Sequence, residues 1–218
     1  MIIVNFKTYK EASGKNGIDL ALKLCEASKD LNIDLIISPQ TIDLKEMVEK
    51  VDCSIWAQHV DAKEQGRTTG FLSAQAVKEA GVEGVLLNHS EHKLSVGEIG
   101  EALSRSKEAG LKTLIFADSL KEASVVSQFN PDYIGYEPPE LIASPDTSVA
   151  RAKPEVIKNV IDELPNSKIL VGAGVKDSVD VETSMKLGAV GIALSSAIVL
   201  AEDPVKILED LAEGFKNK

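Results

Sequence analysis

The chain has 218 residues, of which 44% are hydrophobic, 27% are charged and 4% are aromatic. This composition is ordinary for a globular protein and argues against collagen-like, disordered and membrane-spanning classes. The 34 acidic residues outnumber the 24 basic ones, and the formal net charge at pH 7 is −10. Because phosphate backbones are bound by Lys and Arg, we expect neither nucleic acid nor an anionic membrane as a partner. A small anionic ligand would have to be held by local donors.

Short β-branched runs alternate with longer amphipathic stretches along the whole chain. The runs are almost continuously hydrophobic, which is typical of strands in a parallel sheet covered on both faces. In chain order the predicted strands are Ile2–Lys7, Asp34–Pro39, Ser54–Val60, Gly84–Asn88, Lys112–Asp118, Tyr133–Glu137, Lys168–Gly174 and Val190–Ser195. Between them apolar residues recur every three or four positions, which predicts amphipathic helices.

Signals for helix ends agree with these boundaries. Ser95 and Glu98 have the spacing of a capping box, in which each side chain accepts a hydrogen bond from the backbone of the other. Two prolines stand where a first helical turn tolerates them, and three glycines follow helical patterns as candidate left-handed stops. These residues are Pro154, Pro204, Gly81, Gly110 and Gly188.

Counting predicts eight strand–helix units with no segment left over. An open doubly wound sheet and a closed barrel both consist of such units. Eight units favour the barrel, and no Gly-x-Gly-x-x-Gly follows the first strand, as a dinucleotide-binding sheet would need. The sequence therefore predicts an α/β protein, a (β/α)8 barrel that forms a single domain over residues 1–218.

The two cysteines and the N-terminus bear on the compartment. Cys25 and Cys53 show no metal-ligand or Cys-x-x-Cys spacing, so we expect two buried free thiols in a reducing cytosol. The apolar run at the N-terminus is too short for a signal peptide, and no stretch approaches the ~18 residues of a membrane span. A cytoplasmic location is expected.

Polar residues at the strand ends are the candidate catalytic groups, because a barrel has its active site at the C-terminal ends of its strands. Asn5 and Lys7 lie two residues apart and share one face, so both can point into the barrel mouth. Lys7 would meet there either an anionic ligand or a neighbouring carboxylate. His89 follows the fourth strand, and a helical turn starting at Ser90 would keep it neutral. Glu137 closes the sixth strand, where burial would raise its pKa toward the range of a general base.

Two further regions predict ligand contacts. A stretch of roughly a dozen residues follows Glu137, which is long for such a connection and typical of a lid. Gly172–Gly174 and Ser195–Ala197 follow the seventh and eighth strands. Small residues there let backbone N–H groups approach a ligand, and this is the recurrent phosphate site of barrels.

Four motifs stand at the ends of the first, fourth, sixth and seventh predicted strands: Asn5-x-Lys7, Asn88-His89-Ser90-Glu91, Tyr136-Glu137-Pro-Pro-Glu-Leu-Ile142 and Gly172-Ala-Gly-Val175. Together, in this order, they resemble the triosephosphate isomerase family, particularly its short archaeal form, over essentially the whole chain. The resemblance implies a TIM barrel that interconverts dihydroxyacetone phosphate and D-glyceraldehyde 3-phosphate in glycolysis and gluconeogenesis. It implies no metal and no organic cofactor.

The resemblance also implies residue roles. Glu137 would take a proton from one carbon and return it to the next, and neutral His89 would donate hydrogen bonds to the enediolate oxygens; this pairing is carried over from the family. Lys7 would stabilise the dianionic substrate, and Asn5 would fix that polar edge of the site. Glu91 resembles the family's carboxylate beside the active-site lysine.

For the phosphate, the resemblance implies backbone N–H groups near Ala143, Gly174, Ser195 and Ser196. The loop from Pro138 to about Pro145 would close over the substrate and exclude water. The family also implies a homo-oligomer, a dimer or a tetramer, in which an arm over residues 65–72 reaches the neighbouring subunit.

Two other interpretations stay open. The chain could be another phosphate-binding barrel isomerase or lyase, but this does not account for Lys7, His89 and Glu137 together. It could also bind a phosphorylated metabolite without turnover. Ala143 and Ser195, which stand where the family commonly has glycine, favour that binding protein.

Overall fold

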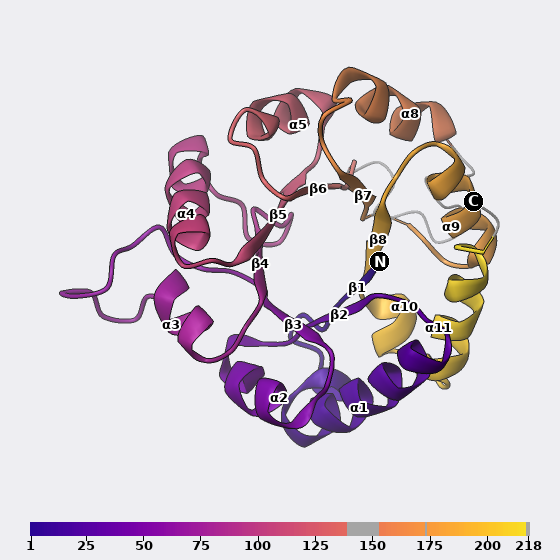
Figure 1. The fold of residues 1–218 in the computed structure, drawn as a ribbon, viewed down its shortest axis with the longest axis horizontal. Coiled ribbons are helices and arrows are strands. Elements are labelled where there is room, and N and C mark those ends of the chain that lie inside the picture. The colour runs from indigo at the N-terminus through magenta and orange to yellow at the C-terminus, as the bar shows by residue number, and fades with distance from the viewer. Residues whose placement is uncertain (139–152, 173, 217–218) are drawn as a thin grey trace.

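The computed structural model describes residues 1–138, 153–172 and 174–216. Within these residues eight parallel strands pair in chain order, and β1 pairs with β8 to close the barrel. The helices surround the ring of strands (Figure 1). The predicted (β/α)8 barrel is therefore confirmed.

The strands are β1 (Ile2–Asn5), β2 (Leu35–Ser38), β3 (Ser54–Ala57), β4 (Gly84–Leu87), β5 (Lys112–Ala117), β6 (Tyr133–Tyr136), β7 (Ile169–Val171) and β8 (Gly191–Leu194). The α-helices are α1 (Gly14–Asp30), α2 (Leu44–Lys50), α3 (Ala74–Glu79), α4 (Val96–Glu108), α5 (Leu120–Ser127), α8 (Pro154–Glu163), α9 (Ser178–Lys186), α10 (Ser196–Val199) and α11 (Pro204–Glu213). Two short 3₁₀ helices, η1 (Lys10–Ala12) and η2 (Thr41–Asp43), precede α1 and α2. Among the described residues, no helix combines the length and the apolar character that crossing a bilayer requires.

Most strands end earlier than the sequence predicts. β1 stops at Asn5 and β6 at Tyr136, so that Lys7 and Glu137 lie just beyond the ladder. β7 stops at Val171, before Gly172. The chain leaves the sheet at these positions because it turns into the barrel mouth. The residues that the sequence assigned to strand ends are therefore mouth residues.

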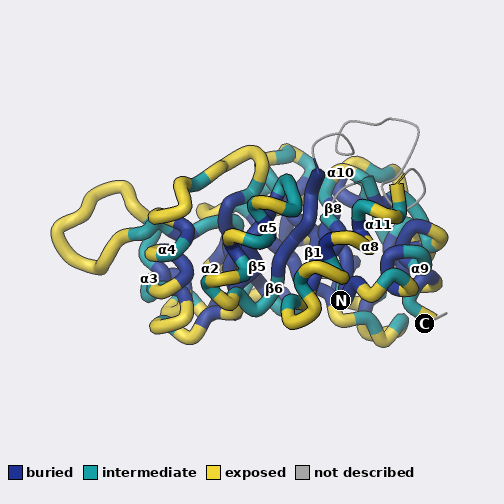
Figure 2. The backbone as a smooth tube through the Cα atoms, turned by 90° about the horizontal axis from the view of Figure 1, so that it is seen from above, coloured by how far each residue is buried: buried dark blue, intermediate teal, exposed yellow. Residues whose placement is uncertain are grey.

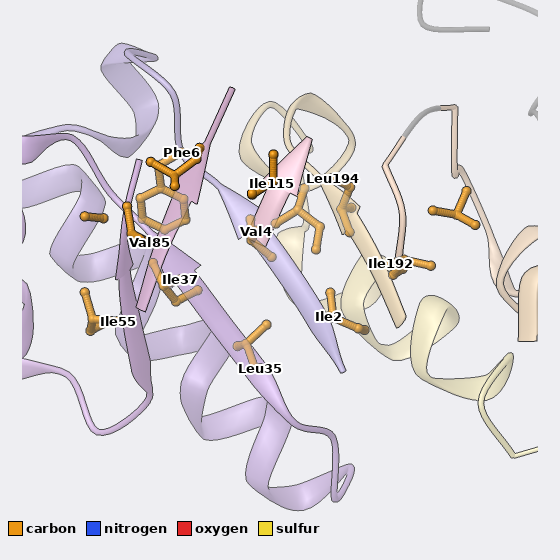
Figure 3. Close-up of a cluster of buried hydrophobic side chains, with 14 of the residues drawn as sticks. Ile2, Val4, Phe6, Leu35, Ile37, Ile55, Val85, Ile115, Ile192 and Leu194 are labelled. Carbon is orange, nitrogen blue, oxygen red and sulfur yellow. The ribbon is translucent and has the colours of Figure 1, made fainter. Parts of the chain in front are cut away.

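The strands pack into two apolar clusters, one on each face of the sheet. On the face toward the helices, residues such as Ile2, Val4, Ile37 and Val85 belong to one cluster (Figure 3). The alternate residues form a second cluster, which includes Ile3, Ile36, Trp56, Leu86, Leu114 and Phe116. Trp56 is 3% exposed and packs so closely on β4 that a Cβ at Gly84 would lie 2.4 Å from its ring.

The predicted helix ends are also confirmed. Ser95 accepts a hydrogen bond from the Glu98 N–H (3.3 Å), and the Glu98 carboxylate accepts one from the Ser95 N–H (2.8 Å), which completes the capping box of α4. Pro154 and Pro204 lie in the first turns of α8 and α11. The three predicted stop glycines all have positive φ: Gly81, Gly110 and Gly188.

The segment between β3 and α3 projects from the barrel and is exposed from residue 63 to residue 71 (Figure 2). Two hydrogen bonds between Asp61 and Leu72 close its base. The Asp61 N–H donates to the Leu72 carbonyl at 2.9 Å, and the Leu72 N–H donates to the Asp61 carboxylate at 2.7 Å. Next to this base, the Lys63 ammonium lies 5.5 Å from the centre of the Phe71 ring. Phe71 is half exposed.

Cys25 of α1 and Cys53, just before β3, form a disulfide with their Cα atoms 5.8 Å apart. The expectation of two free thiols is therefore wrong. This separation lies within the range that a disulfide spans. The linear spacing of 28 residues carries no signal of it, because α1 meets the start of β3 only in the folded barrel.

We expect reduction of this disulfide to lower the thermal stability of the chain. By constraining the unfolded state a disulfide contributes about 2–4 kcal/mol, which for a chain of this length corresponds to about 4–16 °C in Tm. Calorimetry with and without a phosphine reductant measures the shift, and Cys53→Ser is the matched control, because its Tm should be low and indifferent to reductant. An equal Tm for the oxidised and reduced wild-type chain contradicts the prediction.

Candidate active site

The barrel mouth holds a cavity of about 750 Å³ at the C-terminal ends of the strands. Seven of the predicted site residues line it: Asn5, Lys7, His89, Glu137, Gly174, Ser195 and Ser196. The eighth, Ala143, lies outside the described residues, as do positions 139–145 of the predicted lid. Strand ends that are far apart in the sequence thus contribute to one cavity.

Lys7 enters the cavity on a strained turn. Its φ is +46°, in the left-handed region that side chains other than glycine rarely adopt. The Asn5 side-chain oxygen accepts the Lys7 N–H at 2.9 Å. The Gln58 amide nitrogen lies 3.1 Å from that same oxygen and 3.0 Å from the Lys7 carbonyl, so it holds both sides of the turn. Sequence reasoning missed Gln58, although a polar residue directly after β3 was the available signal.

The Lys7 ammonium donates to a Glu91 carboxylate oxygen at 2.7 Å. Of the two partners expected for Lys7, the described residues thus supply the carboxylate. The Glu91 side chain is 61% exposed, and an ion pair at such a site is worth little. The ammonium therefore remains available to an anion that enters the mouth.

His89 is neutral at pH 7, and its hydrogen bond shows which nitrogen carries the proton. The Glu91 N–H donates to His89 Nδ1 at 3.1 Å, so Nδ1 is the acceptor and the proton lies on Nε2. Burial first, and then the nearby Lys7 ammonium, lower the pKa of His89 to about 4. The neutral state is the one that the sequence predicts. The predicted turn at Ser90 contributes the Glu91 N–H to Nδ1, and the structure adds burial as the largest cause of the lowered pKa.

Glu137 leaves β6 with its carboxyl group buried in the cavity wall. Its Oε2 lies 3.8 Å from His89 Nε2. Burial raises the pKa of Glu137 to about 8, against the opposing effect of the Lys7 ammonium. The direction is the one that the sequence predicted. A carboxylate with this pKa binds a proton much more strongly than an exposed glutamate does.

Gly172 makes room for that carboxyl group. A Cβ at this position would lie 2.6 Å from Glu137 Cγ and 2.7 Å from Glu137 Oε1, closer than side-chain atoms pack. Sequence reasoning assigned the Gly172 segment to close approach of a ligand. The structure adds that the missing side chain serves the carboxyl group of Glu137.

The cavity is also lined by Gly174, Lys176, Ser195 and Ser196, which follow β7 and β8. Gly174 has a φ of +68°, which suits glycine at this turn. The buried Ser195 hydroxyl has no hydrogen-bond partner among the described residues. Sequence reasoning missed Lys176, a second cation of the lining. Nowhere in the described residues do three or more His, Cys, Asp or Glu side chains gather so that they could hold a metal ion.

A carboxyl group of raised pKa beside a neutral imidazole, with an ammonium at the same mouth, can move a proton on an anionic molecule and stabilise a developing oxyanion. On a (β/α)8 barrel these features define an enzyme of acid–base chemistry.

Comparison with known proteins identifies the family. The family model of triosephosphate isomerase matches residues 1–123 and 99–211. The triosephosphate isomerase of Saccharolobus solfataricus is 39% identical over 213 residues, which cover 96% of this chain and 93% of that protein. Those of Methanothermus fervidus and Methanocaldococcus jannaschii are 35% and 34% identical over 215 residues, 97% of this chain and 96% and 98% of theirs. The chain belongs to the triosephosphate isomerase family.

We expect Gly172→Ala to lower the isomerase kcat by about 100-fold, because the added methyl group displaces the Glu137 carboxyl group, and misplacement by about 1 Å has effects of this size. Steady-state kinetics measure the loss, and circular dichroism shows whether the barrel is intact. Gly97→Ala on α4, where a Cβ meets nothing within 4 Å, is the matched control and should retain wild-type kcat. An unchanged kcat in Gly172→Ala would show that the methyl group is accommodated without moving the base.

Proposed function

We propose that this member of the triosephosphate isomerase family interconverts dihydroxyacetone phosphate and D-glyceraldehyde 3-phosphate with Glu137 as the base, His89 as the hydrogen-bond donor and Lys7 as the cation. The observation that carries the proposal is the 3.8 Å separation between Glu137 Oε2 and His89 Nε2 in the cavity that Lys7 also lines. Asn5 serves the site by holding the Lys7 turn.

The chemistry follows from the protonation states. Ionised Glu137 removes a proton from the carbon beside the carbonyl group and returns it to the neighbouring carbon, so the reaction consumes no proton. His89 carries its proton on Nε2 and donates it as a hydrogen bond to the oxygens of the enediolate intermediate. A neutral imidazole is a weaker acid than an imidazolium, so it stabilises these oxygens by hydrogen bonding. The proton that leaves the hydroxyl oxygen of one carbon is passed through Nε2 to the carbonyl oxygen of the other, and His89 ends the reaction neutral again. The Lys7 ammonium balances the charge that develops on them.

We propose that the substrate phosphate lies against Gly174, Ser195 and Ser196. The positive φ of Gly174 and the unpartnered buried hydroxyl of Ser195 support this placement, because a phosphate oxygen would satisfy that hydroxyl. The proposal also includes a backbone N–H contact from near Ala143 to the phosphate. It includes closure of the lid, from Pro138 to about Pro145, over the substrate.

We further propose that residues 1–218 act as one domain within a homo-oligomer. The exposed segment from 63 to 71, with a half-exposed aromatic ring at Phe71, supports an interface with a second copy. The net charge of −10 supports the absence of nucleic-acid and membrane partners. The cytoplasmic location stays a prediction.

Glu137→Gln should lower kcat by about 1,000-fold, because the amide cannot accept the substrate proton and general-base contributions are of this order. A coupled assay from glyceraldehyde 3-phosphate measures turnover, and protection by inorganic phosphate in thermal denaturation reports anion binding. We expect Glu137→Gln to keep that protection. If the wild-type chain binds phosphate and shows no turnover, the chain is the binding protein that the sequence left open.

The value of kcat/KM should rise with pH and level off above pH 8. Glu137 accepts a proton only when ionised, and the pKa of its carboxyl group in the free protein is about 8. The pKa of His89 is about 4, so this histidine stays neutral throughout the rise and does not itself change kcat/KM there. Because the phosphate of the substrate itself titrates near a pH of about 6, the profile is measured between pH 7 and pH 10.

Lys7→Met provides the check on this assignment. The Lys7 ammonium lowers the pKa of Glu137, so its removal should move the rising limb to higher pH, in addition to lowering kcat/KM. A profile of kcat/KM that is flat from pH 7 to pH 9 in the wild-type chain would contradict a raised pKa of the catalytic base. An unmoved rise in Lys7→Met would assign the rise to a group other than Glu137.

A further inference from the structure

Glu122 lies at the third position of α5 and does not line the active-site cavity. Its carboxylate nevertheless contacts both ends of the segment that carries His89. One end is Asn88, whose side-chain nitrogen donates to Glu122 Oε1 at 2.9 Å. The other is Lys93, whose ammonium lies 2.6 Å and 2.7 Å from the two carboxylate oxygens. A single carboxylate thus fastens the turn on either side of the imidazole.

Asn88 has the conformation that needs such support. It is 1% exposed and its φ is +58°, in the left-handed region, directly before His89. Its side-chain nitrogen also donates to the Phe116 carbonyl, and its side-chain oxygen accepts the Leu94 N–H, each at 2.9 Å. With the bond to Glu122, the amide contacts β5, α5 and the far end of its own turn. These bonds fix the backbone from which the His89 ring projects.

Lys93 links the same carboxylate to the charges of the site. Its ammonium also lies 3.2 Å from an Asp118 oxygen, so that it is held between Asp118 and Glu122. Its positive charge lowers the pKa of both His89 and Glu137. Releasing Lys93 from Glu122 would move a positive charge that affects the pKa of both His89 and Glu137.

We propose that Glu122 is a positioning residue for catalysis, which holds Asn88 and Lys93 so that the His89 ring keeps Nε2 toward Glu137. The inference rests on the proposed function for its kinetic consequences, and its structural part can be tested without them. Glu122 also has an ordinary structural task, since its carboxylate accepts the Asp118 N–H at 2.8 Å near the start of α5. The experiment must separate the two.

The test compares Glu122→Ala with Glu122→Gln. Alanine removes every contact, whereas glutamine keeps an oxygen that can accept from Asn88 and loses the charge that holds Lys93. We expect kcat to fall by about 10- to 100-fold in Glu122→Ala, as for small misplacement of a catalytic group, with KM changed far less, and Glu122→Gln to recover part of the loss. Glu98→Ala is the matched control, because it removes the equivalent bond at the start of α4. It should lose stability and keep kcat.

Two readouts show whether Glu122 acts through His89. In a His89→Gln background, Glu122→Ala should cost little further kcat, since residues that act as a unit are not additive. Nitrogen NMR of the imidazole should show the Nε2–H form in the wild type and in Glu98→Ala, and a mixture of both tautomers in Glu122→Ala.

Several results would overturn the inference: wild-type kcat in Glu122→Ala, the same loss in both backgrounds, or an equal loss in Glu98→Ala. If the wild-type chain shows no isomerase turnover, the proposed function fails, and the NMR comparison alone then decides the role of Glu122. An unchanged tautomer in Glu122→Ala would reject it.

Discussion

The burial of the Glu137 carboxyl group is the constraint on which the site depends. Transferring a carboxylate out of water is costly, and the cost is what raises its pKa to about 8 and makes it a strong base. Gly172 leaves the space in which the group is buried, and Lys7 supplies the positive charge that limits the shift. His89 reaches Glu137 because the two follow β4 and β6, which flank β5 in the barrel. Phe116 of β5 fills the gap, with its ring 4.9 Å from the imidazole.

Backbone strain occurs where two of the proposed catalytic groups enter the mouth. Among the described residues, four other than glycine have positive φ: Lys7, Asn32, Asn88 and Asn130. Asn32 and Asn130 follow α1 and α5, where asparagine commonly ends a helix. Lys7 and Asn88 are different, because each lies at or beside a proposed catalytic position and is held by a side chain from another unit of the barrel. Gln58 secures the first and Glu122 the second. The strain therefore persists because neighbouring units impose it.

What could be predicted from the sequence was mainly local. Strand and helix periods, the Ser95–Glu98 capping box and the glycine stops depend on residues a few positions apart, and they placed Lys7, His89 and Glu137 at strand ends. Contacts between distant segments left no such pattern. The Cys25–Cys53 disulfide, the Gln58 clamp and the Glu122 contacts each join separate units of the barrel. For His89 the pattern predicted the charge state and the turn at Ser90 but not the larger cause, because burial and the position of Lys7 can be assessed only in the assembled mouth.

The charge of the whole chain sets a further condition on the proposed substrate. A dianion approaching a chain with net charge −10 is repelled at long range, so its attraction must arise within the cavity. In the free protein the Lys7 ammonium is already shared with Glu91, which weakens the local positive potential. On the proposed placement, the residues that follow β7 and β8 must therefore contribute strongly to phosphate binding, and Lys176 is a cation among those that the structure describes there. On this view Lys7 is poised for the charge that develops on the enediolate during the reaction, because an exposed partner such as Glu91 is easily displaced or shared.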